Sequence, residues 1–199
     1  MLILGLNYKV IRPISSTIMN PIIEACSRID WTQDGYGRRE QPLRHGKVIE
    51  FPFVVEGERI SSDPYGPVEM QIIETTKPLL AWMSKLYPKS LWIRGSLGAL
   101  PPGSTLGWHI DNGWHHPLCY RYHVPVITND GCKEMWNNDE VHMAVGYLYE
   151  FNNIAIHSAT NQGMEYRSHL IFDMMPESEW NDFKFPQKAV KRKHLAYAA

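Results

Sequence analysis

The feature that most constrains the fold is the pattern of the chain after Pro88, where short apolar or alternating segments follow one another with turn-forming residues between them. These turns are marked by Pro101-Pro102-Gly103, Asn129-Asp130-Gly131, Asn152-Asn153 and Asn161-Gln162-Gly163. Several short strands at close, regular spacing are typical of an antiparallel sandwich or barrel. We therefore predict a mainly β core over residues 89–175.

Flanking elements are predicted on the N-terminal side of this core. The apolar spacing favours a helix over residues 15–29, disrupted at Pro21, and an amphipathic helix over residues 68–87, kinked near Pro78. Two further elements are expected between the helices: a loop or lid over residues 31–46 and a strand over residues 47–55. The helices are expected to pack on the outside of the barrel.

The chain length and composition fit a single globular domain. With 199 residues there is room for one domain, which we divide into a mixed helical and strand part over 1–88, the β core, and a C-terminal helix and tail over 176–199. The longest apolar stretches fall far short of the roughly 18 residues that cross a bilayer, so no membrane association is expected. The start of the chain lacks a charged region and an Ala-x-Ala site, so we expect no signal peptide.

Charge and cysteine content narrow the partners and the compartment. The formal net charge is −1, which gives no overall attraction to nucleic acid and disfavours a nucleic-acid substrate. The three cysteines form no Cys-x-x-Cys pair, a pattern that favours a reducing cytoplasm over a disulfide scaffold.

Three residues predict a metal site. His109 and Asp111 lie two apart, so on a strand both side chains point to the same face. His157 follows in an apolar strand. Alone it is interpreted as a hydrogen-bonded core histidine, but with the other two it completes the set of two His and one carboxylate that holds Fe(II) and leaves coordination positions open. A closed sheet can bring these distant strands together.

Two arginines are candidates for binding an anion. Arg167 begins an alternating segment in which His169 and Asp173 share its face, and a buried guanidinium needs an anionic partner such as a dicarboxylate. Arg121 and His123 likewise share a face and are candidates for the other carboxylate. The alternatives are a surface position for Arg167 and, for Arg121, an ion pair with a nearby acidic residue such as Glu134 or Asp139.

The residues between about 91 and 174 resemble the aspartyl/asparaginyl β-hydroxylase family of Fe(II)- and 2-oxoglutarate-dependent oxygenases. Each motif alone is degenerate, but their order and spacing together are specific. The resemblance rests on Pro102-Gly103, His109-x-Asp111, Arg121-x-His123-x-Pro125, Gly146, Phe151-Asn152-Asn153, His157, Arg167 and Leu170-Ile171-Phe172-Asp173.

This resemblance implies a double-stranded β-helix, the jelly-roll or cupin-like fold, with flanking helices. It implies that His109, Asp111 and His157 hold iron, although some family members have Gly in place of the carboxylate. It further implies O2 as reactant, ascorbate as a reductant in assays, and 2-oxoglutarate as cosubstrate. The cosubstrate residues carried over are Arg167 for the distal carboxylate, Arg121 and His123 for the other end, and Ser96 for a small polar role.

Residues around the triad are assigned to the substrate or to support of the metal ligands. Four side chains are candidates for the pocket mouth or a substrate carboxylate: Arg94, Trp108, Asn112 and Trp114. For the two tryptophans, packing in the core is the competing interpretation. Asn153, Ser158 and Asn161 are candidates to orient His157.

The leading hypothesis is a 2-oxoglutarate-dependent hydroxylase of an Asp, Asn or Pro side chain in a peptide or protein. A free amino acid or another small molecule is the alternative substrate. Two other hypotheses remain at this point. A cupin-like metalloenzyme without an oxoacid cosubstrate would have no need of Arg167, and a non-catalytic jelly-roll binding module would have no need of an intact triad.

Overall fold

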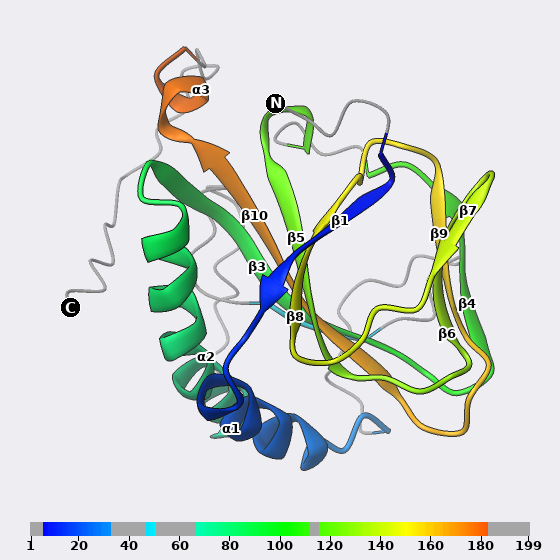
Figure 1. Cartoon of the computed structure of the whole chain (residues 1–199). Helices are drawn as coiled ribbons and strands as arrows, with labels where there is room; N and C mark the ends of the chain where they lie inside the picture. The colour runs from blue at the N-terminus through cyan, green and yellow to red at the C-terminus, as the bar shows by residue number, and fades with distance from the viewer. Residues whose placement is uncertain (1–5, 33–46, 51–66, 112–115, 183–199) are drawn as a thin grey trace.

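The structure is a computed structural model that describes residues 6–32, 47–50, 67–111 and 116–182. Two antiparallel sheets face each other (Figure 1). The larger sheet has the order β1-β8-β5-β10-β3-β2 and the smaller has the order β4-β9-β6-β7. The strands are β1 Tyr8–Pro13, β2 Lys47–Glu50, β3 Ser90–Leu100, β4 Ser104–His109, β5 Tyr120–Ile127, β6 Cys132–Trp136, β7 Asp139–Val141, β8 Tyr147–Phe151, β9 His157–Asn161 and β10 Arg167–Pro176.

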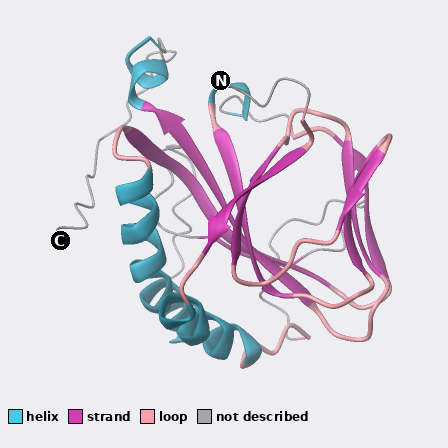
Figure 2. Cartoon of the chain, in the orientation of Figure 1, coloured by secondary structure: helices cyan, strands magenta, loops and turns pink. Residues whose placement is uncertain are grey.

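Two helices lie together on the outer face of the larger sheet (Figure 2). They are α1 Ser16–Ser27 and α2 Pro67–Leu86, with a short α3 Glu177–Asp182 after the last strand and a single 3-10 turn, His116–Leu118. The main hydrophobic core fills the space between α1, α2 and this sheet. Leu170 and Phe172 of β10 are fully buried in it. The alternate residues of β10 therefore face the space between the two sheets.

The mainly β jelly-roll architecture with flanking helices is confirmed. Both predicted helices form, and each contains its proline within a continuous helix. Ser15 caps α1 by accepting a hydrogen bond from the Thr17 backbone N–H. Within the predicted strand 47–55 the structure describes residues 47–50, which are β2, and most of the predicted lid over 31–46 lies outside the described residues.

The N-terminal part contributes more to the sheet than its prediction as outer packing implied. The strand β1 was not predicted; it pairs antiparallel with β8 and forms one edge of the larger sheet. The strand β2 pairs with β3 at the opposite edge. Residues 1–88 therefore supply two edge strands as well as the two covering helices.

Asn161 secures the connection between β9 and β10. Its amide donates hydrogen bonds to the carbonyls of Leu100, at 3.0 Å, and Glu165, at 2.8 Å. Its side-chain oxygen accepts from the Gly163 N–H at 3.1 Å. The side chain is fully buried, and it lies at the opposite end of β9 from His157. Its contacts thus secure the turn, which differs from the predicted role of orienting His157.

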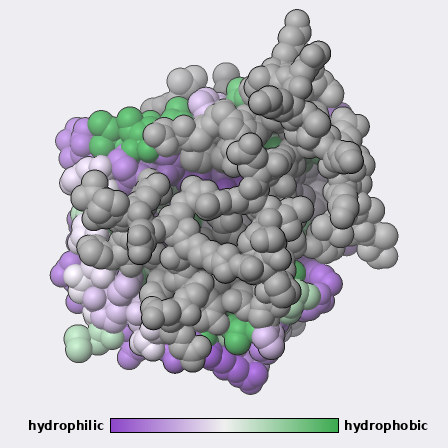
Figure 3. All heavy atoms as spheres, turned by 180° about the vertical axis from the view of Figure 1, so that it is seen from behind, coloured by the Kyte–Doolittle hydropathy of each residue, from purple (hydrophilic) through white to green (hydrophobic). Residues whose placement is uncertain are grey.

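Seen from behind, the described residues in view are mostly hydrophilic, and apolar side chains gather in separate groups among them (Figure 3). None of the described helices combines the length and the apolar character needed to span a membrane. All three cysteines are buried and unpaired.

Candidate functional site

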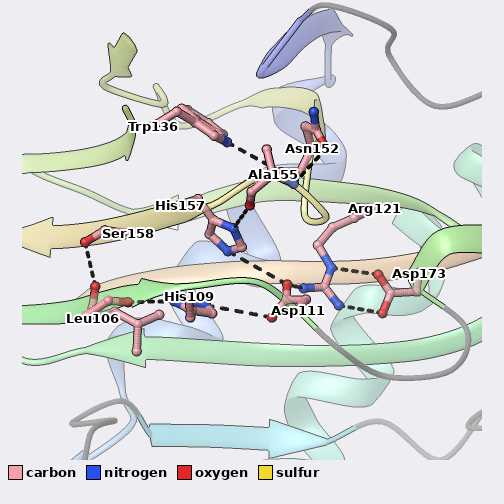
Figure 4. A network of polar contacts seen from close by, with 11 residues as sticks. Leu106, His109, Asp111, Arg121, Trp136, Asn152, Ala155, His157, Ser158 and Asp173 are labelled. Atoms are coloured by element: carbon pink, nitrogen blue, oxygen red, sulfur yellow. Dashed lines mark hydrogen bonds and ion pairs between the residues drawn. The ribbon is translucent and has the colours of Figure 1, made fainter. Parts of the chain in front are cut away.

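The three predicted metal ligands converge at one end of the smaller sheet (Figure 4). His109 is the last residue of β4 and His157 is the first residue of β9, and the two are direct partners in the antiparallel register. Asp111 follows two residues after His109, and its backbone N–H donates to the Asn153 carbonyl at 3.1 Å. Strand pairing and this turn bond therefore bring together two segments that lie far apart in the chain.

The geometry of the three side chains suits a bound cation. Nε2 of His109 lies 3.7 Å from one carboxylate oxygen of Asp111, and Nε2 of His157 lies 3.9 Å from the other. These separations are too long for hydrogen bonds, and one ligand atom from each residue lies within 4.8 Å of the others. One ion can therefore contact all three.

Backbone carbonyls orient both imidazoles of this triad. Nδ1 of His109 lies 2.7 Å from the Gly107 carbonyl, and Nδ1 of His157 lies 2.9 Å from the Ala155 carbonyl. Each ring therefore carries its proton on Nδ1 and presents the Nε2 lone pair to Asp111, as metal-binding histidines do. Burial lowers the pKa of His157 to about 4, so this ring is neutral and able to coordinate a metal at neutral pH.

Arg121 is held between two carboxylates beside the triad (Figure 4). Its Nε and Nη2 each donate to Asp173 at 2.7 Å, and Nη1 contacts Asp111. Burial opposes the charge, but Asp173 and Asp111 raise the pKa of Arg121 above its ordinary value. One cation and two carboxylates leave a net negative charge, which favours a bound cation. Because all three nitrogens contact carboxylates, the predicted role of Arg121 at the end of a cosubstrate is revised to holding Asp111.

A second buried cluster lies deeper between the sheets. It consists of His123 from β5, Glu134 from β6, and Arg167 and His169 from β10. Arg167 Nη2 contacts Glu134 and lies 2.9 Å from Nδ1 of His169. Burial lowers the pKa of Arg167 to about 10, so it stays charged at neutral pH. Burial, together with neighbouring arginines, lowers the pKa of both imidazoles well below the usual range.

The ring of Phe151 separates the two clusters. It stacks on His123 with ring centres 4.3 Å apart and meets His157 edge-on at 5.0 Å. Phe151 is 3% exposed. The Phe151 ring therefore lies between His157 of the triad and His123 of the second cluster.

The two predicted residues of β3 lie next to this inner space. In the register of β3 with β10, Ser96 pairs with Ile171 and Arg94 pairs with Asp173. Ser96 is buried, whereas Arg94 is partly buried. Both lie beside the strand that carries Arg167.

Asn153 and Ser158 do not contact His157 in the way that was predicted. Ser158 Oγ donates to the Leu106 carbonyl at 2.6 Å and so ties β9 to β4. The amide of Asn153 is fully buried, and within the described part of the chain neither of its atoms has a hydrogen-bond partner. The Ala155 carbonyl orients His157 instead.

The predicted pocket-mouth residues are only partly described. Trp108 is 55% exposed, so the competing interpretation of core packing is wrong for this residue. Its exposed apolar neighbours Ile110 and Ile156 flank the same metal ligands. Asn112 and Trp114 lie outside the described residues.

Sequence reasoning did not identify several residues that shape the site. Asp173 was placed on the face of Arg167, but its pairing with Arg121 was not predicted; Glu134 was named as a partner for Arg121 and instead contacts Arg167. In both metal-site histidines the orienting carbonyl belongs to the residue two positions earlier. The sequence carries no signal for these contacts, because every residue has a backbone carbonyl.

The fold and the site together define a class of protein, the jelly-roll oxygenases. The described chain resembles a 2OG-Fe(II) oxygenase family oxidoreductase from Burkholderia pseudomallei, with a TM-score of 0.55, 12% identity, and coverage of 86% of this chain and 85% of that one. It also resembles a Pseudomonas putida prolyl-4-hydroxylase, with a TM-score of 0.55, 12% identity, and coverage of 87% and 94%. At this level of identity the likeness shows the fold.

A third solved structure of the same fold is a viral collagen prolyl hydroxylase from Paramecium bursaria Chlorella virus-1 in a 2OG complex. Its TM-score is 0.51 at 12% identity, with coverage of 86% of this chain and 97% of that one. No curated protein matches the sequence. Residues 70–176 match the sequence model of the aspartyl/asparaginyl beta-hydroxylase family. This match covers more than half of the chain, so the protein belongs to that family and is an oxygenase.

Proposed function

We propose that the protein is an Fe(II)- and 2-oxoglutarate-dependent dioxygenase that hydroxylates a C–H bond of an Asp, Asn or Pro side chain in a peptide or protein. The observation that carries this proposal is the arrangement of the triad. Two imidazoles with carbonyl-bound Nδ1 atoms direct their Nε2 lone pairs at one carboxylate. Such a set of two His and one carboxylate is the facial triad of non-haem Fe(II) oxygenases.

The residues of the triad fit the iron that the family implies. His109, Asp111 and His157 would hold it, and the bound iron would supply activation of O2 together with a 2-oxo acid. Arg121 would keep the Asp111 carboxylate turned toward the two imidazoles while Asp173 balances its charge. Phe151 and the neighbouring buried side chains would exclude water from one side of the site.

Arg167 is the residue we assign to the distal carboxylate of 2-oxoglutarate. It lies ten residues after His157, on the strand whose alternate side chains face the space between the sheets. Its guanidinium is charged and buried, which suits a bidentate contact with a carboxylate. Two further residues would line the path of the cosubstrate: Ser96 and His123, whose ring stacks on Phe151.

The surface beside the triad supports a substrate with apolar contacts. Trp108, Ile110 and Ile156 are all exposed and flank the two histidine ligands in sequence. Arg94, on β3, would suit a substrate carboxylate. Trp108 and Ile110 alternate with His109 and Asp111 and therefore lie on the outer side of this segment. A peptide is long enough to extend from the iron to these side chains, whereas a free amino acid, the second candidate substrate, is not.

The other two hypotheses predict different behaviour. A cupin-like metalloenzyme would bind the metal but would not need Arg167 for activity. A binding module would bind neither metal nor 2-oxo acid productively. The intact triad and the membership of an oxygenase family favour an enzyme.

The deciding experiment measures succinate formed from 2-oxoglutarate by the full chain with Fe(II) and ascorbate under air. Substrate panels contain Asp-, Asn- and Pro-containing peptides, since two structural neighbours are prolyl hydroxylases, and in parallel the free amino acids. We expect succinate formation, stimulated by a peptide that gains one oxygen by mass spectrometry. Turnover that is unaffected in Arg167→Ala would contradict the assigned cosubstrate role. Absence of any succinate would contradict the proposed function.

A further inference from the structure

Arg167 already contacts a carboxylate within the protein. Glu134 projects from β6 into the space between the sheets and is 3% exposed. One of its oxygens contacts Arg167 Nη2 and lies 3.9 Å from Nδ1 of His169. Arg167, which we assign to the distal carboxylate of 2-oxoglutarate, therefore already has its charge balanced by the Glu134 carboxylate of the protein itself.

Among the described residues, Arg167 is the one arginine or lysine in contact with Glu134. Arg167 and His169 approach from β10 and His123 from β5, while His142, which follows β7, lies near His169. Cys132 lies on the same strand as Glu134, and the residues opposite Glu134 in the register are Ala159 and Val141. The buried imidazoles of His123 and His169 are neutral. A bound dicarboxylate would therefore place two carboxylates against one guanidinium.

Arg121 and Arg167 contact their carboxylates in different ways. Arg121 also faces two carboxylates, but they lie on opposite sides of its guanidinium and use different nitrogens. Glu134 instead reaches Nη2 of Arg167, the same nitrogen that contacts His169. Two carboxylates forced onto one guanidinium in a buried space repel each other strongly.

We propose that Glu134 determines the affinity for the 2-oxo acid by competing with its distal carboxylate for Arg167, and that binding is accompanied by uptake of one proton at Glu134. The proton comes from solvent and converts the Glu134 carboxylate to the neutral acid, while the carboxylate of the cosubstrate takes over the contact with Arg167. No other bond forms or breaks. This inference rests on the proposed function, because it takes 2-oxoglutarate to be the ligand of Arg167.

Proton uptake is measured first on the wild-type protein. The full chain is loaded with Mn(II), which replaces Fe(II) without turnover, and 2-oxoglutarate is titrated in by calorimetry in two buffers of different ionisation enthalpy at pH 7.5. We expect close to one proton taken up per molecule bound, and the dissociation constant to rise by up to about tenfold per pH unit toward alkaline pH. Binding without proton uptake would overturn the proposal.

The second measurement assigns the proton to Glu134. Glu134→Gln keeps the size of the side chain and removes its charge; Glu140→Gln, on the same sheet at an exposed position beside Lys133, is the matched control. We expect Glu134→Gln to bind 2-oxoglutarate about tenfold more tightly at pH 8, with no proton uptake, and the control to behave as wild type. Weaker binding in Glu134→Gln, or unchanged proton uptake, would overturn the proposal.

Two controls separate this proposal from the underlying function. Mn(II) binding tests the fold of each variant, because Glu134 contacts no residue of the triad in the described structure. If the wild type binds Mn(II) but no 2-oxoglutarate, the proposed function fails, and the inference fails with it. If 2-oxoglutarate binds to the wild type with the same affinity at pH 6.5 and pH 8, the inference alone fails. Should Glu134→Gln not fold, the wild-type calorimetry decides.

Discussion

Two clusters with the same inventory lie on either side of the Phe151 ring. Each contains two histidines, one carboxylate and one arginine that contacts that carboxylate: the metal-site cluster with Arg121 and the inner cluster with Arg167. They differ in what surrounds the arginine. Asp173 neutralises Arg121 from the side away from the triad, whereas within the described residues no second carboxylate contacts Arg167.

The difference decides which ligand each cluster suits. In the metal-site cluster the backbone takes up Nδ1 of both rings, so both Nε2 lone pairs remain for a cation. In the inner cluster Arg167 donates to Nδ1 of His169, and this ring nitrogen can no longer bind a metal. Two histidines and a carboxylate thus suit a metal ion here because backbone carbonyls orient the rings. A second carboxylate, Asp173, also balances the charge of the nearby arginine.

The largest expected effect is the difference in Mn(II) affinity between two variants, each of which lacks one histidine of one cluster. His157→Ala should abolish measurable Mn(II) binding, because loss of a ligand costs more than the roughly 10- to 100-fold that loss of an outer hydrogen-bond partner costs. His169→Gln should leave Mn(II) affinity within about threefold of wild type. Calorimetric titration of Mn(II) measures both. A large loss of Mn(II) affinity in His169→Gln would mean that the inner cluster binds the ion.

A second effect tests the balance of charge around Arg121. Asp173→Asn removes a buried carboxylate that receives two hydrogen bonds from Arg121. Arg121 keeps its contact with Asp111, so we expect the lower end of the cost of breaking a buried ion pair, about 3 kcal/mol of unfolding free energy. We also expect weaker Mn(II) binding, since the full charge of Arg121 then acts on Asp111.

The control for this variant is an exposed acid. Asp139→Asn alters a carboxylate that accepts one hydrogen bond from Asn7 at the surface, and should change the unfolding free energy by less than about 0.5 kcal/mol. Urea denaturation with Mn(II) titration gives both quantities. If Asp173→Asn is as stable as the control, Asp173 does not balance Arg121.

The sequence predicted the strand face of these side chains but not their partners. Period-two alternation placed Arg167, His169 and Asp173 on one face, and the structure agrees because β10 is regular there. The ion pair considered for Arg121 forms, but not with Glu134 or Asp139, which were named as examples. Arg121 lies opposite Asp173 of β10 in the strand register and bonds to that carboxylate. Alternation shows the face of a side chain but not which strand lies opposite.

Long-range pairing also limited the prediction of the fold. The core strands of residues 89–175 could be predicted because each is bounded by turn residues, and β10 even carries its own alternation. The strand β1 was missed because an edge strand of six residues has meaning only beside β8, more than a hundred residues later. His109 and His157 likewise become neighbours only through the pairing of β4 with β9. The family resemblance, and not any local pattern, predicted that these two histidines lie together.

The buried imidazoles make the stability of the metal-free protein depend on pH. The folded protein keeps His123, His157 and His169 neutral, with the pKa of His157 lowered to about 4 by burial. The unfolded chain titrates near pH 6.5 and so binds more protons than the folded one between about pH 4 and 6.5. The free energy of unfolding should therefore fall as pH decreases, by up to about 1.4 kcal/mol per pH unit for each such ring.

Urea denaturation of the metal-free protein at pH 7.5, 6.5 and 5.5 measures this slope. His169→Gln removes one of the three rings and should reduce the slope below pH 6.5 by about 1.4 kcal/mol per pH unit. A stability that does not change over this range would show that the rings do not stay neutral in the fold. Such a result would contradict the neutral imidazoles described for both clusters.

The smallest expected effect separates bonding within the sheet from support of the metal. Ser158 and Ser168 are both buried serines on β9 and β10; Ser158 donates to the Leu106 carbonyl, while Ser168 Oγ has no hydrogen-bond partner among the described residues. Ser158→Ala should cost about 1 kcal/mol of unfolding free energy, because the Leu106 carbonyl loses its partner, and Ser168→Ala should be neutral or stabilising. In the described structure neither serine hydroxyl hydrogen-bonds to His157, so Mn(II) affinity should stay at the wild-type value in both variants. Weaker Mn(II) binding in Ser158→Ala would show that the hydrogen bond between β9 and β4 helps to position His109 and His157. Ser158 would then support the metal site as well as the sheet.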